Sequence, residues 1–315
     1  MSALVGWIRR NRGPMRIAAL ALALHSLRKW LRRRNLGLHI RSSLCLVTGA
    51  SSGIGAATAV LLAQRGAAKV VLVARRRIQL DEVADRVREA GAVAVVLPTD
   101  CSDIEQVDNL RYEVLKQHGT PSLIVHAAGA GRWRRLTETS AEEALACMDA
   151  PYTSAMLVSR AFLPKMLRLD RAHLAFAQSP AAASAPAGAT AYVAARFALR
   201  GLYEALWADL YGTRVVVSQV HMNEVDDSDY FTGDQTSRSR LPSIRHLLGA
   251  PSSCEACAQS IVGAAEAGAP EAYSNLLLHL HLVGQQLLPQ LYSLLVAVTS
   301  PGRYAVSSEQ DCPPS

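Results

Sequence analysis

Acidic residues are missing from the beginning of this 315-residue chain. No Asp or Glu occurs before Asp81, whereas ten Arg and Lys residues lie between Arg9 and Arg41. The formal net charge of +7 is therefore concentrated at the N-terminus and does not run as a stripe along the chain. The sequence also lacks a basic region with interleaved aromatics, zinc-finger spacing and an RNP-like motif. Together these absences argue against nucleic-acid binding.

Cysteine is sparse, and the six cysteines are scattered too widely for the dense disulfide framework of a small secreted fold. Cys254 and Cys257 form a lone CxxC at the start of a predicted amphipathic helix. Neither a second Cys pair nor a His pair follows at the spacing of a zinc site. The sequence therefore predicts no metal site.

The N-terminal segment, residues 1–41, has no apolar run long enough to span a bilayer. The run from Ile17 to Leu24 is too short, and basic residues follow it. Leucines recur on one helical face between Leu20 and Leu31, beside a cluster of arginines. We expect an amphipathic helix that lies on a membrane surface. A helix docked on the following domain is an equal alternative, and import into an organelle also remains open.

From residue 44 onward, short apolar runs alternate with helical patterns. The predicted strands are 44–48, 69–74, 93–98, 122–126, 173–178 and 214–220. The predicted helices between them are 53–66, 80–91, 103–118, 141–168 and 190–211. This alternation predicts an α/β domain over residues 42–270, a doubly wound parallel sheet of the Rossmann type.

The first strand–helix junction carries the glycine-rich sequence "VTGASSGIG". Glycines at this junction permit a tight turn and let the backbone approach a pyrophosphate at the helix N-terminus. We therefore expect a dinucleotide cofactor here. The residues expected to bind it are Thr48, Gly49, Ser51, Ser52, Gly53, Ile54 and Gly55.

The end of the second predicted strand decides which dinucleotide is expected. NAD-binding proteins usually carry an acid there, which binds the adenosine ribose. This chain instead has Arg75 and Arg76, followed by a third arginine. Arginines pair well with phosphate, so the sequence predicts NADP(H).

In combination, these residues resemble the short-chain dehydrogenase/reductase family. "TGASSGIG" matches its TGxxxGxG motif, and Asp100 falls where the family has an acid that contacts the adenine. "HAAG", which contains Ala128 and Gly129, stands at the place of the NNAG motif. Ser179 precedes Tyr192 by the spacing of the family's catalytic pair. The chain looks like a divergent, NADP-preferring member with YxxxR in place of YxxxK.

The resemblance implies hydride transfer between a nicotinamide and a small-molecule carbonyl or alcohol. By position, Tyr192 would exchange the hydroxyl proton, Ser179 would hold the substrate oxygen, and Arg196 would replace the lysine that binds the nicotinamide ribose. Members of the family often form homodimers through the helix that carries the tyrosine. The family's lysine also helps the tyrosine to ionise, and an arginine supplies the same permanent charge. A cation at ~4 Å with an effective dielectric of ~20 stabilises a tyrosinate by up to ~4 kcal/mol.

Four departures from the family pattern support an alternative reading. The lysine is Arg196, a helix asparagine aligns with Pro151, and the first two positions of NNAG are His126 and Ala127. Met222-Asn223 replaces a Pro-Gly pair after the sixth strand. A proline inside a helix frees a carbonyl, which could hold a relay water in place of the asparagine. The alternative to an oxidoreductase is a catalytically degenerate nucleotide-binding or membrane scaffold protein.

The C-terminal segment, residues 271–315, is rich in leucine from Asn275 onward. Histidines, glutamines and Pro289 interrupt the apolar run, which argues against a simple transmembrane helix. We expect helices on a membrane surface, or a hydrophobic lid over a substrate cleft, followed by a disordered end. A lid of this composition favours an apolar, lipid-like substrate and a membrane-associated protein.

Overall fold

The computed structural model describes residues 37–304, except residues 130, 233, 244 and 246–248. The basic segment 1–36, with its predicted amphipathic helix, lies outside the described residues, as does the end of the chain after residue 304.

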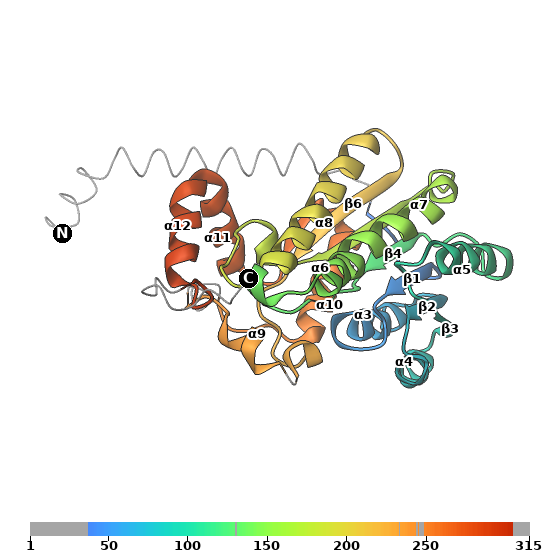
Figure 1. The fold of residues 1–315 in the computed structure, drawn as a ribbon. Helices are drawn as coiled ribbons and strands as arrows, with labels where there is room; N and C mark the ends of the chain where they lie inside the picture. Colours follow the sequence, from blue (N-terminus) through green and yellow to red (C-terminus); the bar gives the residue numbers. More distant parts are fainter. Residues whose placement is uncertain (1–36, 130, 233, 244, 246–248, 305–315) are drawn as a thin grey trace, which may run out of the picture.

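A seven-stranded sheet forms the centre of the described chain (Figure 1). Its order is β3-β2-β1-β4-β5-β6-β7, and every neighbouring pair is parallel. The strands are β1 Leu44–Thr48, β2 Lys69–Ala74, β3 Val93–Pro98, β4 Leu123–His126, β5 Ala172–Gln178, β6 Val215–His221 and β7 Glu271–Tyr273. The predicted doubly wound parallel sheet is thus confirmed. Only β7 was not predicted from the sequence.

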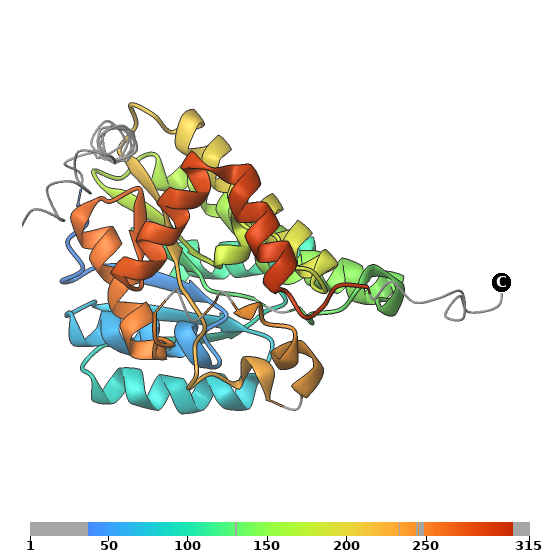
Figure 2. The ribbon, with the colours of Figure 1, turned by 90° about the vertical axis from the view of Figure 1, so that its left-hand side faces the viewer.

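Helices cover both faces of this sheet. One face carries α3 (Gly53–Gln64), α4 (Arg77–Glu89) and α10 (Cys254–Ala267). The other carries α5 (Ile104–Gln117), α7 (Ser154–Met166) and α8 (Thr190–Asp209), with α6 (Ala141–Met148) against α8. Figure 2 shows the sheet between these two layers.

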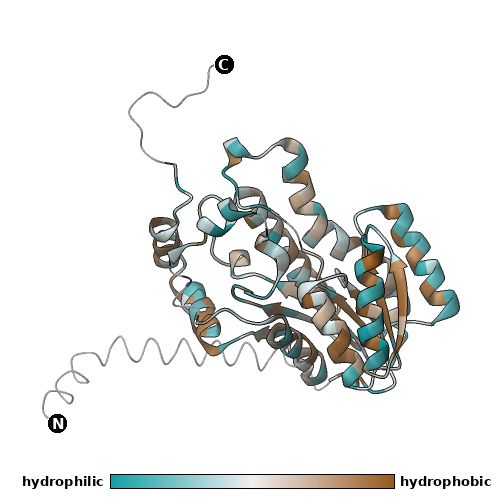
Figure 3. Ribbon diagram, turned by 90° about the horizontal axis from the view of Figure 1, so that it is seen from below, coloured by the Kyte–Doolittle hydropathy of each residue, from teal (hydrophilic) through white to brown (hydrophobic). Residues whose placement is uncertain are grey.

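Side chains alternate between the two faces of the sheet along each strand, so the hydrophobic core has two parts, one on each face. In β1, Cys45 and Val47 are fully buried in the core beneath α3 and α10, whereas Leu46 is fully buried in the core beneath α7. Successive side chains of a strand point to opposite faces, so a strand covered on both sides is apolar throughout. In Figure 3 the strands are accordingly brown, while the outer helices alternate between brown and teal.

The sheet extends beyond the boundary expected at residue 270. β7 begins at Glu271 and pairs with the end of β6, and the N–H of Gln219 donates to the carbonyl of Pro270 at 3.0 Å. A strand of three residues is too short to show an alternating pattern. That brevity explains why the sequence placed these residues in the C-terminal tail.

The leucine-rich tail folds as two helices, α11 (Leu276–Leu287) and α12 (Pro289–Thr299). They are bent against each other by 119° at the break between them. Within the described residues, no single helix is long and apolar enough to cross a membrane, although this bent pair meets the criterion of length and composition when taken together.

Candidate active site

A cavity of about 770 Å³ opens where β1, β4, β5 and β6 end, a common position for ligands in open α/β sheets. Its walls contain all the predicted site residues except Thr48, namely Gly49, Ser51, Ser52, Gly53, Ile54, Gly55, Arg75, Arg76, Asp100, Ala128, Gly129, Ser179, Tyr192 and Arg196. Thr48 is fully buried in β1, and its hydroxyl donates to the carbonyl of Val125 at 3.4 Å. Thr48 therefore links β1 to β4 next to the glycine-rich turn and does not line the cavity.

The glycine-rich turn between β1 and α3 has no room for side chains at two points. A Cβ on Gly49 would lie 2.7 Å from the backbone of Ala128, and one on Gly55 would lie 2.2 Å from the carbonyl oxygen of Gly49. Gly53 differs, because its φ of +54° favours glycine while nothing lies within 3.8 Å of the position of a Cβ. Among the described residues, no side chain caps the N-terminus of α3, where Ser52 is the N-cap residue. An open, uncapped helix start over a glycine turn fits a pyrophosphate.

Two arginines border the turn at the end of β2. Arg76 donates from Nη2 to the hydroxyl oxygens of Ser51 at 3.0 Å and Ser52 at 2.8 Å, while Arg75 is exposed beside it. Asp100 follows β3, and its carboxylate accepts hydrogen bonds from the N–H and the hydroxyl of Ser102. These groups surround the end of the cavity where the sequence predicted the adenosine.

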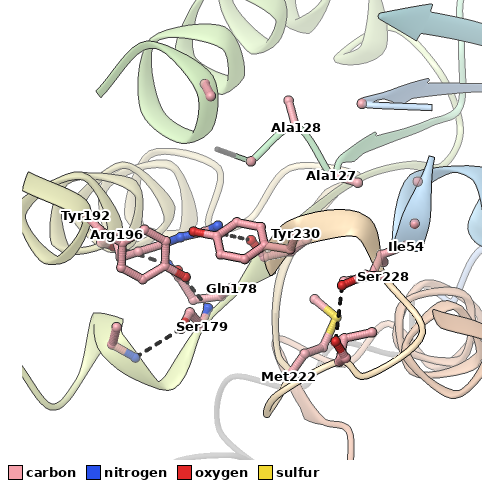
Figure 4. Close-up of a pocket in the computed structure, with 18 of the residues that line it drawn as sticks. Ile54, Ala127, Ala128, Gln178, Ser179, Tyr192, Arg196, Met222, Ser228 and Tyr230 are labelled. Atoms are coloured by element: carbon pink, nitrogen blue, oxygen red, sulfur yellow. Dashed lines mark hydrogen bonds between the residues drawn. The ribbon is translucent and has the colours of Figure 1, made fainter. Parts of the chain in front are cut away.

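Ser179, Tyr192 and Arg196 meet at the other end of the cavity (Figure 4). Tyr192 and Arg196 are both buried on α8, and the guanidinium carbon of Arg196 lies 5.1 Å from the centroid of the tyrosine ring. Arg196 also donates from Nη1 to the carbonyl of Ala177 at 3.2 Å. Ser179 follows β5, and its hydroxyl oxygen accepts from the N–H of Ala181 at 3.2 Å. The predicted contact between the tyrosine and the cation four residues later is therefore present.

Sequence comparison agrees with this geometry. Residues 43–237, more than half of the chain, match the sequence profile of the family described as short chain dehydrogenase. The chain belongs to the short-chain dehydrogenase/reductase family.

Relatives of this short-chain dehydrogenase/reductase include an uncharacterized oxidoreductase of Staphylococcus aureus (strain MRSA252). It is 29% identical over 202 residues, which are 64% of this chain and 86% of the relative. An uncharacterized oxidoreductase of Mycobacterium bovis is 31% identical over 194 residues, which are 60% of this chain and 57% of that protein.

Two solved structures are similar in fold. A short-chain dehydrogenase/reductase from Burkholderia phymatum in complex with NAD has a TM-score of 0.69 at 23% identity, over 81% of this chain and 96% of its own. A metagenomic short-chain oxidoreductase in complex with NADP has a TM-score of 0.63 at 26% identity, over 76% of this chain and all of its own. The two structures hold different nicotinamide cofactors.

The helix that carries Pro151 is interrupted in this short-chain dehydrogenase/reductase. Residues Asp149–Thr153 form a π-helical turn between α6 and α7. Pro151 is buried in the turn, and the hydroxyl of Ser154 donates to the carbonyl of Ala150. Ala146, Asp149, Ala150 and Ser154 line the cavity. The interruption predicted at Pro151 thus borders the site, while a relay water on a freed carbonyl stays a prediction.

His126, at the first position of the altered NNAG motif, is fixed away from the cavity. Its ring stacks on Phe176 with centroids 4.7 Å apart, and its Nε2 pairs with the hydroxyl of Ser159 at 2.9 Å. Burial lowers the pKa of His126 to about 3, so the ring is neutral at physiological pH. His126 is therefore a packing residue between β4 and α7.

Asn223, in place of the Pro-Gly pair after β6, ties this strand to later segments. Its amide nitrogen donates to the carbonyl of Ala250 at 2.6 Å. Its amide oxygen accepts from the hydroxyls of Ser252 and, at 3.0 Å, Ser274. The departure thus replaces a rigid dipeptide with a hydrogen-bonded anchor.

The sequence did not predict several residues of the cavity wall. Trp133 and Tyr230 pack against Tyr192, with ring centroids 5.6 Å and 6.3 Å away. His281 of α11 and Val296 of α12 also reach the cavity. The adjacent aromatics Tyr230 and Phe231, within an otherwise polar stretch after β6, were the one local signal that could have indicated such a role.

Proposed function

We propose that this short-chain dehydrogenase/reductase is an NADP(H)-dependent oxidoreductase of apolar carbonyl or alcohol substrates. The observation that carries the cofactor preference is the pair of arginines at the end of β2. Arg76 donates hydrogen bonds to the hydroxyl oxygens of Ser51 and Ser52, and Arg75 is exposed beside it. No acidic residue occurs between Ala74 and Arg77. Two cations and two hydroxyls suit a ribose phosphate better than a ribose hydroxyl.

The catalytic chemistry follows from three side chains. When bound, the nicotinamide supplies or accepts the hydride. Tyr192 gives its hydroxyl proton to the carbonyl oxygen in reduction, and takes it back in oxidation. Ser179 holds that oxygen by a hydrogen bond. Arg196 places a permanent positive charge 5.1 Å from the tyrosine ring, and its Nη2, which lies close to Gly129, would donate to the ribose.

The substrate class is supported by the apolar walls beyond Tyr192. Trp133 and Leu241 are buried there, and Phe231 and Val296 lie on the wall as well. A pocket lined mainly by apolar side chains favours a substrate that carries few polar groups besides the reacting oxygen. A lipid-like ketone, aldehyde or alcohol meets this description.

We also propose that the outer side of α11 and α12 contacts a membrane surface. No Asp, Glu, Lys or Arg occurs from Ser274 to Pro301. Large apolar side chains are exposed along these two helices, namely Leu276, Leu277, Leu280, Leu287, Leu288, Leu291, Leu294, Leu295 and Val298. An uncharged apolar face of this extent suits the lipid interface. Since His281 and Val296 of the same helices line the cavity, this position would bring an apolar substrate close to the site.

Pairing of two copies through α8 is a further proposal. Phe197 on this helix is 43% exposed, and Leu145 on the adjacent α6 is 67% exposed. Sedimentation velocity on the protein and on Phe197→Glu tests it. A dimer that the substitution dissociates supports pairing through α8, and a wild-type monomer contradicts it.

The test of the function combines cofactor binding with turnover. Calorimetry gives the Kd for NADPH and for NADH, and consumption of NADPH is followed with a panel of apolar ketones and aldehydes. Tight NADPH binding with turnover of at least one carbonyl supports the proposal. Binding without turnover over the whole panel supports the degenerate nucleotide-binding protein instead.

A further inference from the structure

Tyr230 is the one tyrosine besides Tyr192 on the wall of the cavity, among the described residues. It lies in the segment after β6 and reaches across the cavity to the segment after β4. Its hydroxyl donates to the carbonyl of Gly131 at 2.7 Å. Gly131 in turn lies against Tyr192, since a Cβ there would be 2.9 Å from Cδ2 of that ring.

The side chains of Tyr192, Arg196 and Tyr230 lie close together. Figure 4 shows Tyr192, Arg196 and Tyr230 together on the same side of the pocket. The two phenol rings meet edge to face with centroids 6.3 Å apart, and the ring of Phe231 packs on Tyr230 with centroids 4.9 Å apart. Packing thus fixes the ring of Tyr230, and its hydroxyl hydrogen points to the carbonyl of Gly131.

We propose that Tyr230 is a second catalytic residue, whose hydroxyl donates a hydrogen bond to the oxygen of Tyr192 when that oxygen becomes negatively charged. This inference rests on the proposed function. In reduction, the O–H bond of Tyr192 breaks and an O–H bond forms on the former carbonyl oxygen. The hydrogen of Tyr230 then turns from Gly131 to the tyrosinate and stays bonded to its own oxygen.

The protonation state of Tyr230 supports this role. Burial raises the pKa of Tyr230 well above its ordinary value, and the neighbouring Tyr192 raises it further. Arg196 acts in the opposite direction but does not cancel these effects. The thiol of Cys147, on α6, also faces Tyr230, and its own pKa is raised by burial, so it remains uncharged. The hydroxyl of Tyr230 therefore keeps its proton and is available as a donor.

Such a donor would stabilise the tyrosinate at a site with two departures from the family pattern. Pro151 has no side-chain amide to offer to a proton relay, and Arg196 does not release a proton. The guanidinium of Arg196 donates to Ala177 and lies over the tyrosine ring. A hydroxyl that donates to the tyrosinate oxygen itself adds the directional interaction that a cation over the ring does not supply.

Tyr230→Phe tests the proposal because it keeps the ring and its packing and removes only the donor. A hydrogen bond to a charged group corresponds to roughly ten- to hundredfold in kcat, with KM nearly unchanged. The alkaline limb of the pH–rate profile for reduction should move to higher pH, because the tyrosinate is less stable. NMR of the protein labelled with ¹³C at the tyrosine Cζ, assigned with Tyr192→Phe, should show the titration of Tyr192 moving the same way.

Asp234→Asn is the matched control. Asp234 holds the same segment after β6 through a 2.9 Å ion pair with Arg134 and through hydrogen bonds from the N–H and the hydroxyl of Ser237. If Tyr230 only anchors this segment, both variants should raise KM and leave the titration of Tyr192 unchanged, which would overturn the proposal. The titration needs no turnover. A wild type without activity would therefore contradict the proposed function, whereas an unchanged titration in Tyr230→Phe contradicts the role of Tyr230.

Discussion

Tyr192 is the residue whose hydroxyl we expect to exchange the proton with the substrate. Tyr192→Phe should lower kcat by more than about a hundredfold, because the general acid is lost. The Kd for NADPH should change little, since the ring and its packing on Trp133 remain. Steady-state kinetics and calorimetry check both values. Retention of more than about a tenth of the activity would contradict the assignment.

Arg196 offers a second test among single residues. Arg196→Ala should weaken NADPH binding by about tenfold and move the alkaline limb of the pH–rate profile upward, because a buried charge beside Tyr192 is lost. Arg196→Lys should preserve much of both, since a lysine keeps the charge. The Kd values of both variants are measured by calorimetry. Wild-type affinity in both would indicate that Arg196 has no part in cofactor binding.

At the scale of an element, the turn between β2 and α4 selects the cofactor. The wild type should bind NADPH at least about tenfold more tightly than NADH, a difference that one charge-assisted contact can supply. Arg75→Asp should reverse the preference, because the carboxylate repels a phosphate and accepts from ribose hydroxyls. Arg77→Asp, in the first turn of α4, is the control. Equal binding of both cofactors by the wild type would show that these arginines do not select.

The turn between β1 and α3 makes a steric prediction. Gly55→Ala would place a methyl carbon 2.2 Å from the carbonyl of Gly49, so the turn must open or the helix must shift. We expect loss of NADPH binding together with a lower Tm. Gly263→Ala, in α10, is the matched control because nothing lies within 4 Å of the added carbon. Its stability should stay equal or rise slightly. Unchanged cofactor binding in Gly55→Ala would contradict the close contact.

At the scale of the whole molecule, one carboxylate connects three distant segments. Glu138 accepts from Arg240 at 2.9 Å and pairs with Arg135, which also donates to the carbonyls of Gly302 and Arg303. Hydrogen bonding to Arg240 lowers the pKa of Glu138 from 4.5 to about 2. A depressed pKa stabilises the fold above pH 4.5, and this contribution is lost as the pH falls toward about 2. Glu138→Gln should therefore lower the calorimetric Tm at pH 7, and the difference should shrink below pH 4.5. A difference that is constant with pH would exclude this charge as its source.

The membrane proposal also concerns the whole molecule. Replacing Leu276, Leu280 and Leu294 by Gln should reduce flotation with phosphatidylcholine–phosphatidylserine vesicles by more than about tenfold, because three exposed leucines no longer enter the interface. Leu145→Gln, on α6, removes an equally exposed leucine elsewhere and should leave flotation unchanged. Equal flotation of all three proteins would assign any membrane binding to other parts of the chain.

The parts of the site that were predictable are local in sequence. The glycine turn occupies consecutive residues at one strand–helix junction, and Tyr192 and Arg196 are one helical turn apart, so pattern alone brings each set together. Trp133, Tyr230 and His281 come from segments far apart in sequence that meet only in the folded chain. The sequence repeats of strands (2 residues) and helices (3.6 residues) do not indicate contacts between distant segments. β7 was not predicted because its three residues form a strand only through pairing with β6, which is distant in sequence.

The contact between Trp133 and Tyr192 gives the site an optical reporter. The chain has four tryptophans, and of the two within the described residues only Trp133 lies at the cavity, while Trp207 packs on Tyr211 at the end of α8. Tyrosinate absorbs at wavelengths where indole emits, and the two rings are 5.6 Å apart. Ionisation of Tyr192 should therefore quench the emission of Trp133. In the protein without cofactor, the quenching would follow the protonation state of Tyr192 across a pH titration without an added label.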